Sequence, residues 1–400
     1  MSWSPSWSPR WPARQADGAG GSGAGGSGAG GRPRLLWVDL KPPTPRHDTA
    51  SLRVVQLLAA LDRQGWAVDF AAMFPAPQPA DPADLAACGA RALPCADEAS
   101  ILAHVAREGR HYRAAVLCFA RVARRLLEPI RAAAPGCFVV FDTVDLSHVR
   151  EFRQAKATGN AVILRRALQT RAEELRLTAA ADLTLAITAV EQETLARAVP
   201  GARVAVLAMA AEPGPPPPGP EARADDLLYL GNYQAAPNAD AARFLIGEIL
   251  PLVRARRPAA RALLVGADPD PGLLAMASPQ ARFTGHVPDL APVLGGARAM
   301  VAPLRFGAGL KGKLLTGLAH GLPIVASAVA AEGTGLVPEA DYLAAESAAE
   351  FAAACLRLID DPALWRHLSA AGRRAAERYA LPELDRRVAA LLPVTGTLGQ

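Results

Sequence analysis

Short apolar runs alternate with helix-like stretches along most of this 400-residue chain. The first run, LLWVDL from Leu35, suits a buried strand, whereas SLRVVQLLAALDRQG from Ser51 carries apolar residues at helical spacing. The alternation continues to about residue 212 and restarts after a proline-rich stretch. Because this pattern is typical of parallel strands with helices on both faces, we expect an α/β fold with two doubly wound, Rossmann-like domains facing across a cleft.

The proline-rich stretch PGPPPPGP marks the expected domain boundary, since it can neither continue a helix nor occupy a central strand. The start of the chain contains GAGGSGAGGSGAGG, which buries too little surface to fold. We expect the C-terminal tail to return and brace the first domain. The expected division is a disordered leader at 1–33, an N-terminal Rossmann-like domain at 34–212, a linker at 213–226, a C-terminal Rossmann-like domain at 227–378 and a helical tail at 379–400.

The composition argues against several classes of protein. No run of 18 or more apolar residues occurs, so a membrane span is not expected. The formal charge of +5 suits anionic ligands, but the excess is arginine scattered along helices, which does not indicate nucleic acid. The five cysteines have no metal-ligand spacing and their odd number argues against a disulfide framework. We therefore expect a cytoplasmic protein.

The segment APLRFGAGLKGKLLTGLAHGLPIVASAVAAEG, residues 302–333, carries an unusual group of cations. Arg305, Lys311 and Lys313 gather where a helix is expected to begin. Cations are unfavourable at a helix N-terminus, where the macrodipole is positive, unless an anion binds there. The segment therefore predicts a phosphate-binding loop, with solvent-exposed lysines as the alternative.

Within this segment, the residues from Gly307 to Lys313 also spell the nucleotide-binding pattern G-x-x-x-x-G-K. A P-loop needs Ser or Thr at the next position to hold magnesium, and that position is Leu314. An ATPase or GTPase is therefore the weaker interpretation.

Acidic side chains in two loops of the second half are further candidates. Asp268 and Asp270 flank a proline, as in a pair that positions a metal and a diphosphate, but Asp-Pro is also ordinary turn chemistry. Glu332, followed by Gly333, comes after an apolar strand, where a carboxylate can accept hydrogen bonds from sugar hydroxyls.

The first half offers candidates in two loops that follow strands. His47, Asp48, Thr49 and Ser51 can present groups to a cleft ligand, or some of them can cap the helix. In FDTVDLSHVREFR, His148 lies near carboxylates and is a candidate general base; an ordinary helix start is the alternative.

Several segments together resemble glycosyltransferase family 4, a retaining, sugar-nucleotide-dependent group with the two-domain GT-B fold. The resemblance rests on GNYQAAPNADAARFLIGEILPLV, RFTGHVPDLAPVL and above all the cationic segment, with weaker support from PTPRHDTASLRVVQLLAAL and FDTVDLSHVREFR. It extends from residue 34 to about residue 380.

The resemblance implies roles for the cationic segment. Lys311 and Lys313, with Arg305 nearby, would neutralise the donor diphosphate as the glycosidic bond breaks. The backbone amides near Gly307 and Gly309 would assist. No bound metal is needed, because cations and helix dipoles take that role.

The resemblance also implies contacts with the rest of the donor. Glu332 would face the donor sugar, and the backbone around Gly285, His286 and Val287 would border the base. Thr316 stands where many relatives carry a glutamate that holds the nucleotide ribose.

The expected activity is transfer of a sugar from a nucleotide-diphosphate-sugar donor to a hydroxyl of a glycan, polysaccharide or lipid-linked acceptor. A degenerate GT-B protein that only binds nucleotide sugars, and a sugar-nucleotide epimerase, are the alternatives. No cofactor, metal or nucleic acid is expected. Scattered basic residues leave peripheral contact with an anionic membrane open; they are Arg121, Arg124, Arg125, Arg165, Arg166 and Arg171.

Overall fold

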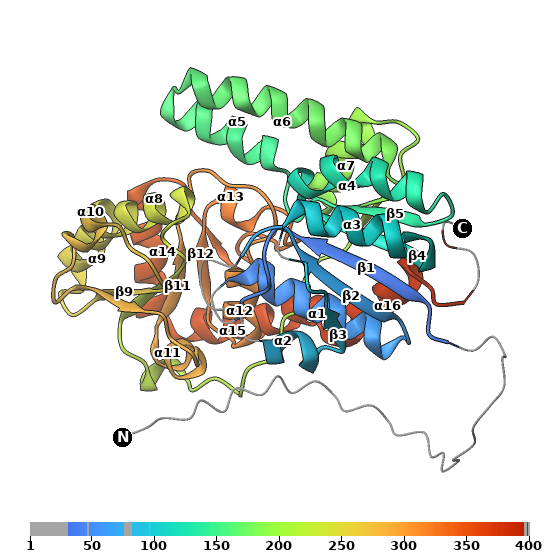
Figure 1. Ribbon diagram of the computed structural model, residues 1–400. Helices are drawn as coiled ribbons and strands as arrows, with labels where there is room; N and C mark the ends of the chain where they lie inside the picture. Colours follow the sequence, from blue (N-terminus) through green and yellow to red (C-terminus); the bar gives the residue numbers. More distant parts are fainter. Residues whose placement is uncertain (1–30, 46–47, 76–81, 96, 396–397, 399–400) are drawn as a thin grey trace, which may run out of the picture.

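A computed structural model describes residues 31–45, 48–75, 82–95, 97–395 and 398, and it contains two parallel sheets with helices packed around each (Figure 1). Among these residues, the first sheet has seven strands in the order β3-β2-β1-β4-β5-β6-β7. Its strands are β1 (Arg34–Asp39), β2 (Ala67–Ala72), β3 (Ala90–Ala92), β4 (Tyr112–Cys118), β5 (Phe138–Asp142), β6 (Leu183–Ala186) and β7 (Val204–Val206). Its helices are α1 (Thr49–Arg63), α2 (Pro82–Ala87), α3 (Glu98–Glu108), α4 (Phe119–Ala133), α5 (Ser147–Thr158), α6 (Ala161–Ala180) and α7 (Ala189–Ala198).

The second sheet, within the described part of the chain, has six strands in the order β10-β9-β8-β11-β12-β13. They are β8 (Asp226–Leu230), β9 (Arg261–Val265), β10 (Ala281–Gly285), β11 (Ala299–Ala302), β12 (Ile324–Ala326) and β13 (Leu343–Ala344). The helices that follow β8 are α8 (Ala236–Phe244), α9 (Leu250–Arg256), α10 (Pro271–Leu274), α11 (Ala291–Gly296), α12 (Gly312–Ala319), α13 (Ala328–Ala331), α14 (Ala348–Asp360), α15 (Pro362–Ala376) and α16 (Leu381–Leu391).

Strand β1 shows why the first sheet is covered on both faces. Leu35 and Trp37 belong to a buried cluster with residues of α1 and α16, whereas Leu36 and Val38 belong to a second cluster with residues of α3, α4 and α6. Side chains alternate between the two faces of a strand, so a run that is apolar at every position must be buried on both sides. The doubly wound α/β architecture expected from the sequence is therefore confirmed.

The C-terminal helix α16 returns to the first sheet. Arg63 of α1 pairs with Asp385 at 2.5 Å, and the indole Nε1 of Trp66 donates to the carbonyl of Leu392 at 2.9 Å. The tail thus braces the first half, and Figure 1 shows α16 beside α1.

Two long helical stretches are interrupted. Helices α8 and α9 are joined by a π-helical turn over Leu245–Ile249. The helical stretch after β5 is α5 and α6, which form a hairpin because Gly159 ends α5 with φ of 65° and Asn160 caps α6. Among the described residues, no helix combines the length and apolar character needed to cross a membrane.

Candidate functional site

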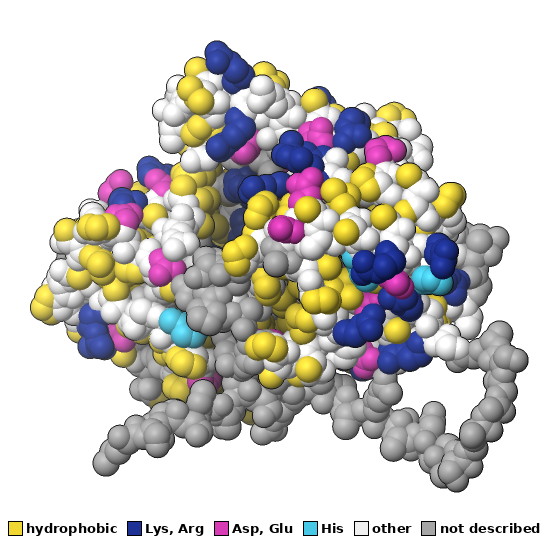
Figure 2. Space-filling view, in the orientation of Figure 1, with side chains coloured by type: hydrophobic (Ala, Val, Ile, Leu, Met, Phe, Trp, Pro, Cys, Tyr) yellow, Lys and Arg dark blue, Asp and Glu magenta, His cyan; other side chains and the backbone are white. Residues whose placement is uncertain are grey.

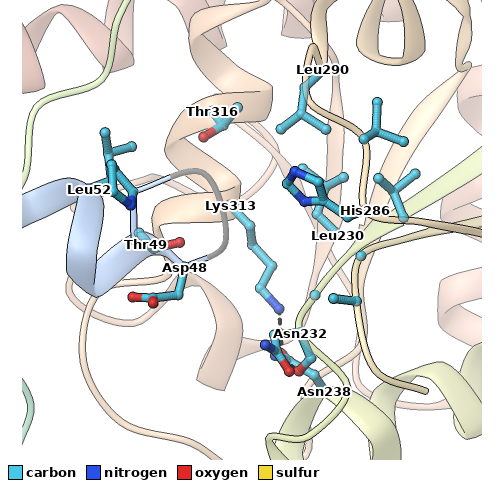
Figure 3. A pocket seen from close by; sticks show the side chains of 16 residues that line it. Asp48, Thr49, Leu52, Leu230, Asn232, Asn238, His286, Leu290, Lys313 and Thr316 are labelled. Carbon is cyan, nitrogen blue, oxygen red and sulfur yellow. Dashed lines mark hydrogen bonds between the residues drawn. The ribbon is translucent and has the colours of Figure 1, made fainter. Parts of the chain in front are cut away.

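Three pockets lie around the first turn of α1. The largest, which we call the lysine pocket, has a volume of about 340 Å³ and is lined by both halves of the chain (Figure 3). The first half contributes the start of α1, including Asp48 and Thr49. The second half contributes the ends of β8 and β9, the loop after β10 and, from α12, Lys313 and Thr316. The carboxyl ends of strands in both sheets therefore meet at one cavity, as expected for this class of fold.

Lys313 points across the lysine pocket toward the end of β8 (Figure 3). Its ammonium donates to Asn238 Oδ1 at 2.5 Å and to the Tyr229 hydroxyl at 3.2 Å, and it lies 4.7 Å from the centroid of the Tyr229 ring. Burial, followed by the charge of Lys311, lowers the pKa of Lys313 to about 7. Since Asn238 and Tyr229, the two hydrogen-bond partners of this ammonium, are neutral, an anion in the pocket would stabilise its charged form.

Lys311 lies behind the same loop and does not line the lysine pocket. It is 8% exposed, donates to the carbonyl of Gly309 at 2.6 Å, and has its pKa lowered to about 8 by burial. The chain has only four lysines among its 43 basic residues, and two of them are Lys311 and Lys313. A lysine, unlike an arginine, changes its pKa readily on burial, so both positions respond to a nearby anion.

The N-termini of α1 and α12 approach each other at the edge of the lysine pocket. A Cβ atom placed on Gly312, the first residue of α12, would lie 2.2 Å from Cγ2 of Thr49, the first residue of α1. Glycine is therefore needed at residue 312 for this approach. Lys313 in the first turn of α12 lines one cavity with the start of α1, which Asp48 caps, and its ammonium suits the cavity to a phosphate or diphosphate.

The glycines earlier in the loop contact the first half. The carbonyl of Gly307 accepts from Arg153 Nη1 at 2.7 Å. Gly309 has φ of 72°, and a Cβ placed there would lie 2.9 Å from Ile187 Cδ1 and 3.2 Å from Asp145 Cβ. Gly309 therefore allows close packing between the halves, and neither glycine lines the lysine pocket.

Arg305 lies outside the lysine pocket, contrary to the position expected for a diphosphate ligand. Its guanidinium pairs with Asp240, and 54% of its side chain is exposed. Leu304 and Phe306 are buried on either side of it, so the arginine between them points outward onto α8.

Glu332 bridges the two halves of the chain. Its carboxylate oxygens accept from Arg153 of α5 at 2.6 and 2.7 Å, and this arginine lowers the pKa of Glu332. A Cβ placed on the following Gly333 would lie 2.4 Å from Thr188 Cγ2. Neither residue lines the lysine pocket, so the expected contact of Glu332 with a donor sugar would compete with its ion pair to Arg153.

On the opposite wall, His286 and Val287 line the lysine pocket. Gly285, with φ of 70°, precedes them, and its carbonyl accepts from Gly266 N at 3.0 Å. Leu290 adds an apolar surface beside them (Figure 3). This wall offers a flat, largely apolar surface to a planar group.

Thr316 also lines the lysine pocket. Its hydroxyl donates to the carbonyl of Gly312 at 3.1 Å, so the oxygen keeps lone pairs that can accept from a ligand hydroxyl. Asn232 and Asn238 line the pocket as well, although sequence reasoning assigned them no role. Their signal was present in GNYQAAPNADAARF, where both asparagines follow a strand.

Asp48 caps α1 and lines the lysine pocket. It accepts from Ser51 N at 2.7 Å, Ser51 Oγ at 2.9 Å and Lys41 Nζ at 2.8 Å. The capping alternative therefore holds for Asp48, and Ser51 supports the cap. His47 lies outside the described residues.

His148 lies away from the three pockets. It is 4% exposed, and its Nδ1 is hydrogen-bonded to Glu174 of α6. Glu174 also accepts from the backbone of Ser147 at 2.9 Å, so the pair ties α5 to α6. The geometry supports a structural role for His148 and gives it no direct path to a substrate hydroxyl.

The remaining motifs have structural explanations. Leu314 is fully buried in the core and offers no hydroxyl for magnesium, which argues against the P-loop interpretation. Asp270 caps α10 and pairs with Arg243 at 2.5 Å, as the turn interpretation predicts. In the described part of the chain, no group of three or more His, Cys, Asp or Glu side chains is arranged to hold a metal ion.

A second cavity, the middle pocket, has a volume of about 290 Å³ and shares Thr49 with the lysine pocket. It is lined by the 308–310 loop, by Ile187 and by Asp145 with its ion-pair partner Arg150. A third cavity, the phenylalanine pocket, has a volume of about 310 Å³ and shares Ala50, Phe119 and Val144 with the middle pocket.

Comparisons with known proteins match this architecture. Residues 224–361, about one third of the chain, match the family described as glycosyl transferases group 1. No curated protein matches the chain. Among solved structures, sucrose-phosphate synthase from Thermosynechococcus elongatus has a TM-score of 0.71 at 18% identity, covering 90% of this chain and 98% of that one.

Two further structures agree. Anabaena HepE in complex with UDP-glucose has a TM-score of 0.67 at 13% identity, covering 90% of this chain and 100% of that one. A glycosyltransferase from Rickettsia africae has a TM-score of 0.64 at 9% identity, covering 91% and 100%. The fold is GT-B. In GT-B terms, the lysine pocket lies in the cleft between the two sheets, and its second-half wall belongs to the segment that matches the family.

Proposed function

We propose that this chain is a retaining glycosyltransferase of family 4 that moves a sugar from a nucleotide-diphosphate-sugar donor to an acceptor hydroxyl. The observation that carries the proposal is the position of Lys313, whose buried ammonium faces a cleft beside the N-termini of α1 and α12. The HepE structure contains UDP-glucose and the family match covers the donor-side wall, which supports a sugar nucleotide as the ligand.

In this proposal the donor diphosphate lies between Lys313 and the two helix starts. Negative charge grows on the diphosphate as the bond to the sugar breaks, and the fixed positive groups stabilise that charge most strongly in the transition state. Lys311 adds a second, more distant charge. A donor phosphate oxygen takes the proton from the acceptor hydroxyl, which attacks the same face that the leaving group departs from. No protein base is then required, in keeping with the distant His148.

The nucleotide takes the opposite end of the lysine pocket. The base lies against His286, Val287 and Leu290, and a ribose hydroxyl donates to Thr316 Oγ1. Residues 227–378 serve as the donor-binding domain and residues 34–212 as the acceptor-side domain. We propose a cytoplasmic enzyme that needs no metal. An anionic membrane contact stays an additional proposal, and exposed Arg165 and Arg166 beside Leu168 of α6 are its best support.

Titration of the purified protein with a panel of sugar nucleotides, followed by an assay for donor consumption, tests the proposal. Tight binding of one donor and consumption that depends on an added acceptor support a transferase. Binding without consumption favours the degenerate binding protein, for which Thr316 is the best argument. Conversion of the donor sugar without an acceptor favours the epimerase, and no binding of any donor contradicts all three.

A further inference from the structure

The phenylalanine pocket lies entirely in the first half of the chain. It is bordered by the first turns of α1, by Leu40 after β1 and by Phe74 and Pro75 after β2. Phe119 at the start of α4 and Val144 after β5 complete the wall. Most of this surface is apolar, and its volume of about 310 Å³ falls at the small end of ligand pockets, where a single compact group fits.

Phe74 gives this pocket an exposed aromatic surface. Its side chain is 38% exposed, which makes it one of the few large apolar side chains that the described fold leaves open to solvent. The guanidinium of Arg121 lies 4.3 Å from its ring centroid and holds one side of the ring. An exposed aromatic ring held in this way is suited to contact an apolar ligand, because that contact removes apolar surface from water.

The backbone at this pocket is strained. Phe119 has φ of 66° and Val144 has φ of 61°, and they are two of the four non-glycine residues with positive φ in the described chain. Such conformations are unfavourable for residues that carry a side chain, and they cluster at ligand-binding sites. Both residues follow neighbouring strands, β4 and β5, and both line the phenylalanine and middle pockets. The strain shapes the passage between these two cavities.

The floor of the phenylalanine pocket carries one buried carboxyl group. Asp39 ends β1, is 6% exposed, and accepts from the backbone N of Leu40 at 2.6 Å. Burial raises the pKa of Asp39 to about 7. Two cations also line the pocket: Lys41, which pairs with Asp48 at 2.8 Å, and Arg121, which lies over the Phe74 ring. Since these cations already have partners and burial disfavours the charged form of Asp39, the pocket suits a neutral ligand.

The three pockets form a series around the start of α1. The phenylalanine pocket shares Ala50 with the middle pocket, and the middle pocket shares Thr49 with the lysine pocket. A molecule whose hydroxyl reaches the donor sugar at the middle pocket can therefore place its other end against Phe74.

We propose that the phenylalanine pocket binds a compact, uncharged ring carried by the acceptor, so that the acceptor is an alcohol or glycoside with an aromatic or alicyclic group rather than a bare sugar chain. This inference rests on the proposed function, because it places the acceptor relative to the donor. It narrows the acceptor to a class defined by the apolar wall around Phe74.

Ligand-observed NMR and calorimetry on the full chain test this inference with three probes: glucose, maltotriose and 4-nitrophenyl β-glucoside. We expect the aromatic glycoside to bind at least about tenfold more tightly than either sugar, since it alone places a ring in the apolar pocket. Phe74→Ala should weaken its binding about tenfold, and Phe74→Tyr should retain it. Leu252→Ala, which removes a 45% exposed side chain on α9, is the matched control and should change nothing.

A second variant tests whether weaker binding in Phe74→Ala comes from the pocket and not from misfolding. Ala50 is exposed in the first turn of α1, where leucine is a good helix former, so Ala50→Leu fills the pocket without disturbing the core. It should also weaken binding of the aromatic glycoside. Titration with the preferred nucleoside diphosphate reports separately on the lysine pocket.

The outcomes separate the two proposals. Equal binding of all three probes, or binding of the aromatic glycoside that neither Phe74→Ala nor Ala50→Leu alters, overturns the acceptor inference while nucleotide binding stays intact. If the unmodified protein binds no nucleotide at all, the proposed function is overturned instead.

Discussion

The lysine pocket and the phenylalanine pocket both touch the first turn of α1, yet their chemistry is opposite. The lysine pocket contains the ammonium of Lys313 from the second half, the Asp48 carboxylate from the first half, and amide and hydroxyl groups. The apolar wall of the phenylalanine pocket comes from loops that follow β1, β2, β4 and β5 of the first half. Figure 2 shows the hydrophobic and basic side chains on one face of the molecule. One helix start thus borders a site for an anion and a site for a neutral group.

Because of this difference, residues of one pocket can be substituted without replacing any residue that lines the other. The two pockets have no lining residue in common, and the middle pocket separates them. Changes in the lysine pocket should affect mainly the donor, and changes in the phenylalanine pocket mainly the acceptor; Asp48 of the first pocket links them by accepting hydrogen bonds from Lys41 and Ser51 of the second. The following predictions are ordered from the largest expected effect to the smallest.

Lys313→Ala removes the charge that faces the lysine pocket. We expect kcat/KM to fall by about 10²-fold or more, because a charge that stabilises the transition state is lost. Lys311→Ala should cost less, since its ammonium lies behind the loop. Lys156→Ala on the exposed part of α5 is the control. A Lys313→Ala enzyme with unchanged kinetics would contradict the assignment of the diphosphate.

Donor affinity should fall as the pH rises above 7. The free protein holds the pKa of Lys313 at about 7, and a bound diphosphate raises that pKa toward its ordinary value near 10.4. Between these values, binding must take up a proton, so the affinity falls by up to about tenfold per pH unit. Calorimetry at pH 8 in buffers of different ionisation enthalpy measures this uptake, which should shrink in Lys313→Ala. Release of a proton on binding would contradict the prediction that the diphosphate raises the pKa of Lys313.

Gly312→Ala should separate the two helix starts, because its Cβ would lie 2.2 Å from Thr49 Cγ2; it would also lie 2.7 Å from the flexible side chain of Met209, which can move aside. We expect about a tenfold loss of kcat/KM, since a displacement of about 1 Å is costly at a reacting centre. Thr49→Ser in the same chain removes the clashing methyl group and should restore part of the loss. If the double variant is no better than Gly312→Ala, the approach of the helices is not what matters.

Thr316→Val should have the smallest effect. The change removes one hydrogen-bond acceptor for the ribose and keeps the shape of the side chain. One such bond is worth about 0.5–1.5 kcal/mol, so we expect the KM for the donor to rise about threefold to tenfold with little change in kcat. An unchanged KM would place the ribose elsewhere.

The core of the fold could be predicted from the sequence because its strands are continuous apolar runs. Strand β1 coincides with the apolar run LLWVDL, whereas β3 and β13 have no such run. These two have three and two residues and lie at the sheet edges, where little apolar sequence marks a strand.

The site was predictable only in part. Lys313 could be predicted because a cation is unfavourable at the positive N-terminus of a helix unless an anion binds there. His286 and Val287 could be predicted only from the family resemblance. The outward direction of Arg305 depends on the burial of its two neighbours, and the position of His148 depends on Glu174, which is 26 residues away. The phenylalanine pocket was not foreseen, because its wall is assembled from four separate loops.

Comparison of matched nucleoside mono- and diphosphates of the preferred base tests the central claim most directly. In the unmodified protein, the diphosphate should bind at least about tenfold more tightly than the monophosphate, because the second phosphate meets Lys313 and the two helix starts. In Lys313→Ala, most of that difference should vanish while the monophosphate still binds. A difference that stays the same in Lys313→Ala would contradict the claim that the lysine pocket holds a donor diphosphate.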